Sequence, residues 1–261
     1  MASIEYLIAT LMNDIEITEF GFLMYRPSYS AKFVEDVIKR RGLKGIRIFD
    51  HWEPLKSLDF LREFDFLTGL EITCRYDQDY AFLRDMPQLE ELSLTGISPT
   101  MDNEIDLSSQ TNVKYLALEW RKNRIKGIEA CKEVIDLCLV DFACEDLRII
   151  KGLSKVSRLR IKTGTIRNCS GIEGLSDLKE VAIGYCRRLT SIAAMTGLHE
   201  LRMINIESSR KIADYELLTD LPKIDVIQLT SCGLIQRFPW KQNLPSLREL
   251  RLLVGTKIAE V

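Results

Sequence analysis

Histidine and cysteine are the side chains of this sequence best suited to catalysis or metal binding, and their spacing supports neither use. The two histidines, His51 and His199, lie far apart in a chain of 261 residues. Zinc sites usually show short paired ligand spacings, and disulfide frameworks an even number of cysteines. The seven cysteines include no CxxC pair and stand at Cys74, Cys131, Cys138, Cys144, Cys169, Cys186 and Cys232. No phosphate-binding loop, GxSxG, HExxH or dinucleotide motif occurs. We therefore predict no enzyme activity, no cofactor and no metal.

A second set of residues has the chemistry of a recognition surface. Tyr, Trp and Arg are the residue types enriched at binding hot spots. Three cations, Arg158, Arg160 and Lys162, alternate along one short segment, where they repel each other unless acids nearby or on a partner offset them. Trp120 has a second interpretation, as part of an irregular loop. The predicted partner-binding residues are Tyr115, Glu119, Trp120, Asp136, Asp141, Arg158, Arg160, Lys162, Tyr185 and Arg202.

A repeated motif predicts how these residues are positioned. The pattern LxxLxL, with Ile, Val or Met in some Leu positions, occurs ten times. Its first positions are Leu43, Leu67, Leu89, Val113, Val134, Val156, Leu178, Leu198, Ile224 and Leu247. They span 204 residues in nine steps, a mean of about 23 residues. A motif of this form with a period of roughly 20 to 29 residues indicates a leucine-rich repeat solenoid.

The chain resembles the class of leucine-rich repeats of about 22 residues found in internalins and in a regulatory subunit of protein phosphatase. The resemblance implies an α/β solenoid of about ten repeats, with a curved parallel sheet on the concave face. In the strand half, Leu178, Val181 and Ile183 alternate with other residues and are expected to point inward. In the return half, apolar residues spaced by about three, such as Leu189, Ile192 and Met195, predict short helical or 3₁₀ turns on the convex face.

The corners before the strands and the loops after them also have sequence signals. Before several strands an apolar residue precedes Pro or Ser, as in Met86-Pro87, Leu221-Pro222 and Leu175-Ser176, which suits a corner because proline cannot donate to a sheet. After the strands, the family places Asn or Cys at the ninth repeat position. Only Cys186 and Cys232 match here, so irregular loops are predicted, with these two cysteines as buried small residues.

The ends of a solenoid need cover, because an open terminal repeat exposes its apolar core. Residues 1–42 are the predicted amino-terminal cap, residues 43–254 the solenoid and residues 255–261 a carboxyl-terminal tail. Within the cap, Ser30 is expected to start a helix over residues 31–41 that Gly42 ends. The tail either folds over the last repeat or leaves an edge for association.

The repeat register maps the concave face, because the third, fifth, seventh and eighth residues of each repeat face that side or its rim. In the first five repeats these positions hold one base against six acids, and in the last five they hold five bases against three acids. The whole chain has a net charge of -2 and a pI of about 5.9. A global basic field for nucleic acid or an anionic membrane is therefore absent.

These features predict a protein-binding module that acts by occupying a protein or long peptide on the concave face. Its output would be that of an adaptor or a stoichiometric inhibitor, for example an immunity protein that blocks a toxin. The alternative is an RNA-binding scaffold that uses the Arg158, Arg160 and Lys162 strip with Tyr185 as a stacking platform. The acidic first half would repel phosphate, so nucleic acid is the less favoured partner.

Location follows from two further observations. Glu5 interrupts the apolar stretch Ile4–Met12, and no cleavage site follows it, so we interpret it as core and not as a signal peptide. No stretch approaches the roughly 20 apolar residues needed to span a bilayer. Seven potentially free thiols fit a reducing compartment. We therefore expect a cytoplasmic monomer.

Overall fold

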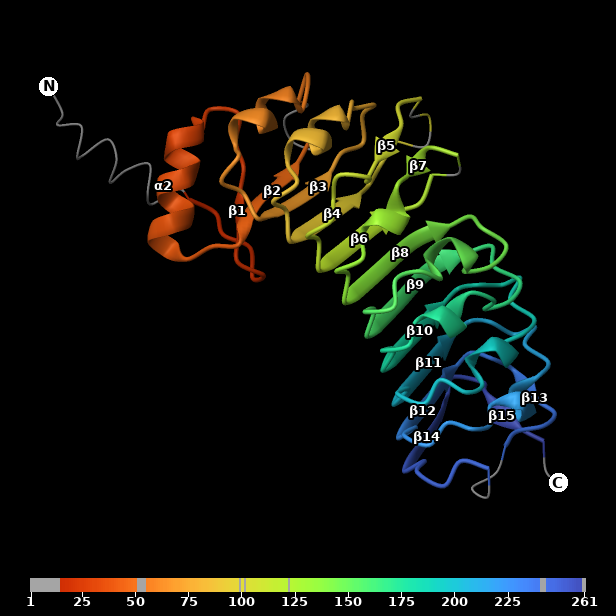
Figure 1. Cartoon of the computed structure of the whole chain (residues 1–261). Helices are drawn as coiled ribbons and strands as arrows, with labels where there is room; N and C mark the ends of the chain where they lie inside the picture. The colour runs from red at the N-terminus through yellow and green to blue at the C-terminus, as the bar shows by residue number, and fades with distance from the viewer. Residues whose placement is uncertain are drawn as a thin grey trace, which may run out of the picture.

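The computed structural model describes residues 15–50, 55–98, 100, 102–121, 123–239 and 243–259, which form one curved solenoid (Figure 1). The chain proceeds along the arc from helix α2 (Ala31–Arg41) to strand β14 (Glu249–Leu253). One parallel sheet lines the inner side of the arc, and the return segments follow its outer side. The predicted leucine-rich repeat architecture is confirmed.

Eleven strands form the sheet, and they pair in chain order, all in parallel. Residues one repeat apart lie opposite each other, as Leu137 lies opposite Leu159. Ten of these strands belong to the ten repeats, whereas the first, in the cap region, was not predicted. The strands are β1 (Phe22–Met24), β2 (Gly45–Phe49), β3 (Gly69–Thr73), β4 (Glu91–Thr95), β6 (Tyr115–Glu119), β8 (Asp136–Phe142), β9 (Arg158–Gly164), β10 (Glu180–Gly184), β11 (Met203–Glu207), β12 (Val226–Thr230) and β14.

The return segments contain short 3₁₀ helices, as the spacing of their apolar residues predicted. These are η1 (Asp59–Glu63), η2 (Ala81–Asp85), η3 (Ile128–Ala130), η4 (Arg148–Ile150), η5 (Ile172–Gly174), η6 (Ala193–Met195) and η7 (Tyr215–Leu217). Two further pairs of short parallel strands lie in other return segments: β5 (Ile105–Asp106) with β7 (Ile125–Lys126), and β13 (Leu234–Ile235) with β15 (Lys257–Ile258). The side chains of Leu189, Ile192 and Met195 are fully buried, so this half closes the core from outside.

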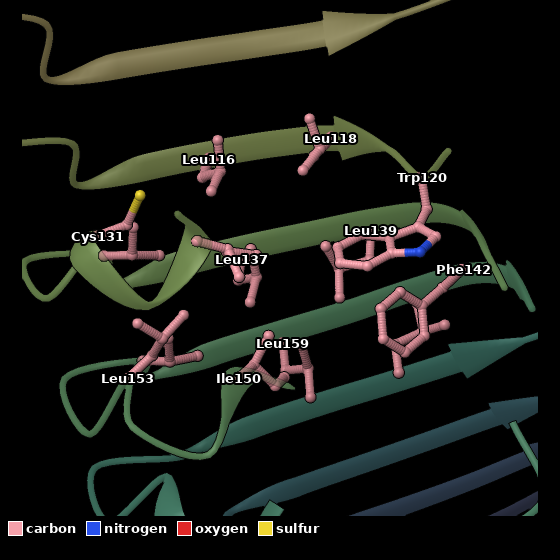
Figure 2. Packing of buried hydrophobic residues seen from close by; sticks show 14 of the residues in the cluster. Leu116, Leu118, Trp120, Cys131, Leu137, Leu139, Phe142, Ile150, Leu153 and Leu159 are labelled. Carbon is pink, nitrogen blue, oxygen red and sulfur yellow. The ribbon is translucent and has the colours of Figure 1, made fainter. Parts of the chain in front are cut away.

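The core lies between the sheet and the return segments and runs continuously through the solenoid. The inward residues of neighbouring strands lie on one side of the sheet (Figure 2): Leu116, Leu118, Leu137, Leu139 and Leu159. Ile150 and Leu153 of the return half meet them. Each repeat therefore buries its leucines against the two repeats beside it, which is the packing that a solenoid requires.

The predicted register of repeat eight is wrong by three residues. Strand β11 begins at Met203, so the first motif position is Leu201 and not Leu198. Leu198 occupies the corner instead, where its carbonyl accepts a hydrogen bond from the Leu201 N–H at 3.0 Å. The corner at Leu221 has the same bond to Ile224, at 3.2 Å. With Leu201 in place of Leu198, the steps of 20 and 26 residues become 23 and 23.

The amino-terminal helix forms as predicted. The Ser30 side chain accepts a hydrogen bond from the Phe33 N–H at 3.3 Å, and Gly42 ends the helix in the left-handed region at φ 61°. Val34 and Val37 are buried against the first repeats. The stretch Ile4–Met12 lies outside the described residues.

Strand β1 completes the amino-terminal end of the sheet. Phe22 is only 1% exposed, and its ring lies on the concave side over Gly69. A Cβ at Gly69 would be 2.9 Å from Phe22 Cε1 and 2.8 Å from the Lys44 carbonyl oxygen, so only glycine leaves room for the ring. The position of Phe22 therefore depends on a glycine two strands away.

The carboxyl-terminal end differs from the expected tail fold. Lys257 and Ile258 pair with β13 in the return half. Among the described residues, no strand pairs with the outer edge of β14. Leu250 and Leu252 of β14 are accordingly only half-buried, although the same positions in the other repeats are buried. The alternative role of this edge in association stays a prediction.

We expect Leu159→Ala to lower the free energy of unfolding by about 2 to 5 kcal/mol, because it leaves a cavity in the continuous core. Lys162→Ala should change it by no more than about 0.5 kcal/mol, because this outward side chain is exposed and, within the described residues, has no ion pair. Chemical denaturation of both variants tests the inward and outward assignment. Equal losses of stability would contradict it.

Candidate functional site

The concave face is formed by the strand residues that alternate with the buried ones. Seven of the ten predicted site residues lie within strands β6, β8 and β9: Tyr115, Glu119, Asp136, Asp141, Arg158, Arg160 and Lys162. Tyr185 directly follows β10. The in-register pairing of the strands places these eight residues on four neighbouring strands of one sheet. Two further predicted residues, Trp120 and Arg202, lie elsewhere.

Trp120 belongs to the core, and its prediction as an exposed concave anchor is wrong. Its side chain is 4% exposed and packs edge-on against Phe142, with ring centroids 4.9 Å apart (Figure 2). Its backbone N–H donates to the Val140 carbonyl at 2.7 Å, which continues the strand ladder. The indole is apolar enough to complete the core beneath the loop of repeat four, where the ladder residue of the family is absent. The alternative interpretation, a residue folded into the loop, is closer to the structure.

Arg202 is the residue before β11, so its predicted concave position fails with the register of repeat eight. Its N–H donates to the Lys179 carbonyl at 2.8 Å, and its exposed side chain lies at the edge where the strands begin. The concave positions of β11 belong to Met203, Asn205 and Glu207.

The cations of β9 are offset within the protein. Arg158 contacts the Asp136 carboxylate at 3.0 Å and the Glu180 carboxylate at 2.8 Å, and Arg160 contacts Asp136 at 2.7 Å. These hydrogen bonds raise the pKa of the Arg158 guanidinium. Lys162 is the exception, because it is exposed and has no ion pair within the described residues. One cation of the predicted strip is therefore free for a partner, and two are already engaged.

The acidic half of the face is also self-paired. Lys44 contacts Glu91 at 3.1 Å, and Arg47 lies 3.6 Å from Glu71. Burial raises the pKa of Glu71, the Glu91 carboxylate adds to the rise, and Arg47 opposes it. The excess of acids read from the sequence is thus partly compensated across neighbouring strands.

Glu119 has a structural role. Its carboxylate accepts a hydrogen bond from the Ile97 N–H at 3.2 Å and also binds Gly96 and Arg121, so it holds the loop that follows β4. The side chain is only 13% exposed, which leaves little of it for a partner.

Two tyrosines remain as large exposed surfaces on the concave side. The Tyr115 side chain is 44% exposed and the Tyr185 side chain 48%. The Tyr185 hydroxyl donates to Glu207 at 2.7 Å, and this bond raises the pKa of the phenol. Asp141 is also exposed, and its N–H donates to Thr163 Oγ1 at 3.1 Å. Both tyrosines lie where the sequence predicted an anchor for a partner.

A hollow in the concave face was missed by sequence reasoning. It has a volume of about 440 Å³, and Ala182 and Gly184 of β10 lie among its lining residues with Arg160, Lys162 and Asn205 of the adjacent strands. Beyond it lie four exposed cations, which also went unnoticed: Arg187, Arg188, Arg210 and Lys211. The available signal was a pair of basic residues repeated after 23 residues, which the wrong register of repeat eight concealed.

The cysteines lie in or close to the core and form no disulfide. Cys186 and Cys232 are buried as predicted, and the Cys232 thiol donates to the Ile206 carbonyl at 3.5 Å. In the corrected register Ser209 takes the same ninth position and donates to the Glu207 carbonyl at 3.2 Å. Within the described ranges no group of three or more His, Cys, Asp or Glu side chains is arranged to hold a metal ion. Of the helices in those ranges, none has the length and apolar character to cross a membrane.

No family model and no curated protein matches the sequence. Solved structures do match. A chain of the Toll–Spatzle complex of Drosophila aligns with a TM-score of 0.65 at 13% identity, over 97% of this chain and 38% of its own length. A chain of the TLR13–ssRNA13 complex aligns with a TM-score of 0.55 at 13% identity, over 88% of this chain and 39% of its own. An internalin from Listeria monocytogenes aligns with a TM-score of 0.48 at 16% identity, over 92% of this chain and 81% of its own.

These likenesses concern the fold. Together with the parallel sheet and its repeat register, the Toll and TLR13 alignments identify the chain as a leucine-rich repeat solenoid. The partners of those proteins do not follow from the fold, since a shared architecture carries many different binding sites.

We expect Trp120→Ala to destabilise the protein by about 3 to 5 kcal/mol, because it removes a buried aromatic side chain from the core. Trp120→Phe should cost less, since it keeps a ring against Phe142. Chemical denaturation measures both changes. A Trp120→Ala variant as stable as the parent would contradict the core position.

The buried thiols should react slowly with Ellman's reagent in the native protein, because burial raises the pKa of Cys131 and Cys186 to about 12 and removes access. After denaturation all seven cysteines should titrate as thiols. Fast reaction of all seven before denaturation, or a stoichiometric metal in elemental analysis, would refute the structural role of these residues.

Proposed function

We propose that this protein is a binding module that acts by occupying a partner protein or a long peptide with its concave face. The leucine-rich repeat fold supports a protein-binding scaffold. Ten steps of about 4.8 Å between eleven strands give a sheet roughly 48 Å long along its curve. A standard interface of about 1,600 Å² fits on such a surface.

Exposed aromatic surface on the concave face is the observation that carries the proposal. Tyr115 and Tyr185 are about half-exposed, although the charges around them are largely paired with each other. Apolar ring surface facing water contributes nothing to the fold, but gains free energy when a partner covers it. A face whose charges are self-paired and whose aromatics are free suits a protein partner.

The finer role that we propose is that of an adaptor or a stoichiometric inhibitor, with an immunity protein that blocks a toxin as one form. Binding alone suffices for each of these roles, and no catalytic step is involved. We place the protein in the cytoplasm as a monomer, because seven cysteines without a disulfide suit a reducing compartment.

RNA binding is the second candidate function, and one comparison favours it, since the TLR13 complex contains single-stranded RNA. Two of the three residues proposed for it, Arg158 and Arg160, already bind Asp136 and Glu180. Their charge is therefore not available to phosphates without loss of these contacts. A steep loss of affinity with salt would support RNA, and a salt-tolerant complex would support protein.

Copurification of the tagged full chain from native lysate, followed by mass spectrometry, would identify the partner. Direct binding of the purified candidate then decides the proposal. A neighbouring gene that encodes a toxin would make the inhibitor role testable by coexpression.

We expect Tyr115→Ala and Tyr185→Ala each to weaken binding of the purified partner by at least about tenfold, because buried aromatic anchors usually dominate an interface. The variant Lys179→Ala, at an exposed residue before β10, is the control and should bind like the parent. Isothermal titration calorimetry measures all three. A partner that binds both tyrosine variants as tightly as the parent does not use the concave face.

A further inference from the structure

The hollow beside β10 interrupts an otherwise filled layer of concave side chains. Its lining includes Ala182 and Gly184, and the residues in register with Gly184 on the two adjacent strands are Lys162 and Glu207. Both neighbours have long side chains, so the small residues leave a gap of about 440 Å³. Such a volume accepts a side chain of a bound segment.

The glycine at position 184 is not required by the backbone. It lies in a regular strand, and a Cβ there would be 3.9 Å from the Ile161 carbonyl oxygen and 4.0 Å from the Glu207 side chain, which is ordinary van der Waals contact. Gly69, in contrast, has no room for a Cβ. A glycine that the fold does not need costs stability in a strand and packs nothing. Its effect here is to keep the hollow open.

Polar atoms around the hollow are left without partners. Within the described residues, Arg160 Nε and Asn205 Oδ1 are buried and form no hydrogen bond, and both residues line the hollow. The Lys162 ammonium beside them has no ion pair among those residues. Buried polar groups are normally satisfied, so a donor, an acceptor and a free cation in one place indicate a missing polar ligand.

Four more cations extend this site toward the ends of the strands. Arg187 and Arg188 follow β10, and Arg210 and Lys211 follow β11 at the equivalent positions of the next repeat. All four are exposed, and none has an ion pair among the described residues. The hollow and the two next to it share lining residues, Tyr185 and Arg187 among them. Together with Lys162 these four residues form the basic rim.

The acids closest to the basic rim are engaged. Glu207 accepts the hydroxyl of Tyr185 at 2.7 Å, and Asp141 is hydrogen-bonded to Thr163. Five cations therefore stand against two carboxylates at this point of a chain whose net charge is -2. Unpaired like charges within a few ångströms are unfavourable in the free protein and attract an anionic ligand.

We propose that the hollow and the basic rim bind an acidic segment of the partner protein. This inference rests on the proposed function and names the chemistry of the partner. One carboxylate side chain of the segment enters the hollow, where Lys162 and Arg160 Nε are the donors, and a backbone N–H of the segment donates to Asn205 Oδ1. Further acids of the segment lie against Arg187, Arg188, Arg210 and Lys211.

The small extent of the basic rim favours an acidic protein segment over nucleic acid. The rim covers repeats six to eight, and the concave residues Val226, Gln228 and Thr230 of the next strand are uncharged. In β14, Arg251 is paired with Glu249 at 2.6 Å. A polynucleotide needs a groove of cations that follows its backbone over many nucleotides, and none continues from the rim.

The test uses the full chain and a fluorescent oligo-glutamate peptide as the probe, with an oligo-glutamine peptide of equal length for comparison. Fluorescence anisotropy at low and at physiological salt measures the affinity. The double variant Arg187→Gln with Arg210→Gln should weaken oligo-glutamate binding by at least about tenfold. Gly184→Leu, which fills the hollow without moving the backbone, should also weaken it.

The matched control is Lys179→Gln with Arg202→Gln. It removes the same two charges from the same two repeats, at the opposite ends of β10 and β11. This control should bind the probe like the parent. Equal losses in both double variants, or equal binding of oligo-glutamate and oligo-glutamine by the parent, would overturn the inference.

Two further outcomes separate this inference from its alternatives. An oligo-uridylate of the same charge should bind more weakly than oligo-glutamate, and tighter binding through the same residues would overturn the proposal in favour of nucleic acid. A purified partner whose affinity depends on Tyr115 but not on Arg187, Arg210 or Gly184 would overturn the acidic segment and leave the concave protein-binding function intact.

Discussion

The structure depends on the inability of any single repeat to bury its own leucines. Each strand contributes two inward side chains, such as Leu137 and Leu139, and these are covered only when a repeat lies on either side. Parallel pairing at one residue register follows, because a shift by one position would turn the leucines outward. Both ends show the constraint. Phe22 of β1 covers the first repeats, whereas the leucines of β14 are only half-buried.

The same alternation divides the two tasks of the chain. Inward positions hold the fold, and outward positions are free to vary, so the concave face can carry a site without loss of core packing. The site is built from differences between neighbouring outward residues: long side chains on β9 and β11, with Ala182 and Gly184 between them. Cross-strand ion pairs neutralise most other charges of the face. What stays available is aromatic surface and a few cations, which is the composition expected of a binding surface.

The solenoid, its strands, the return turns and the capped helix at Ser30 could all be predicted, because they depend on local apolar periodicity. The errors arose where two signals competed. Leu198 and Leu201 both begin a possible motif, and only the packing of Ile204 and Ile206 selects the second. Trp120 lies at the end of a strand, where sequence spacing does not say whether the ring turns inward. The ion pairs of Asp136 and the hollow at Gly184 depend on neighbours a whole repeat away, so they appear only when the strands are aligned.

Hydroxyl-radical footprinting of the complex with the identified partner would test most directly that the concave face is the binding surface. Exposed side chains exist on both faces, with Tyr115, Tyr185 and Met203 on the strand side and Ile149 and Leu217 on the 3₁₀ helices of the convex side. We expect partner binding to protect the first three from oxidation and to leave the other two unchanged. Protection of Ile149 and Leu217, with Tyr115 and Tyr185 oxidised as in the free protein, would contradict this.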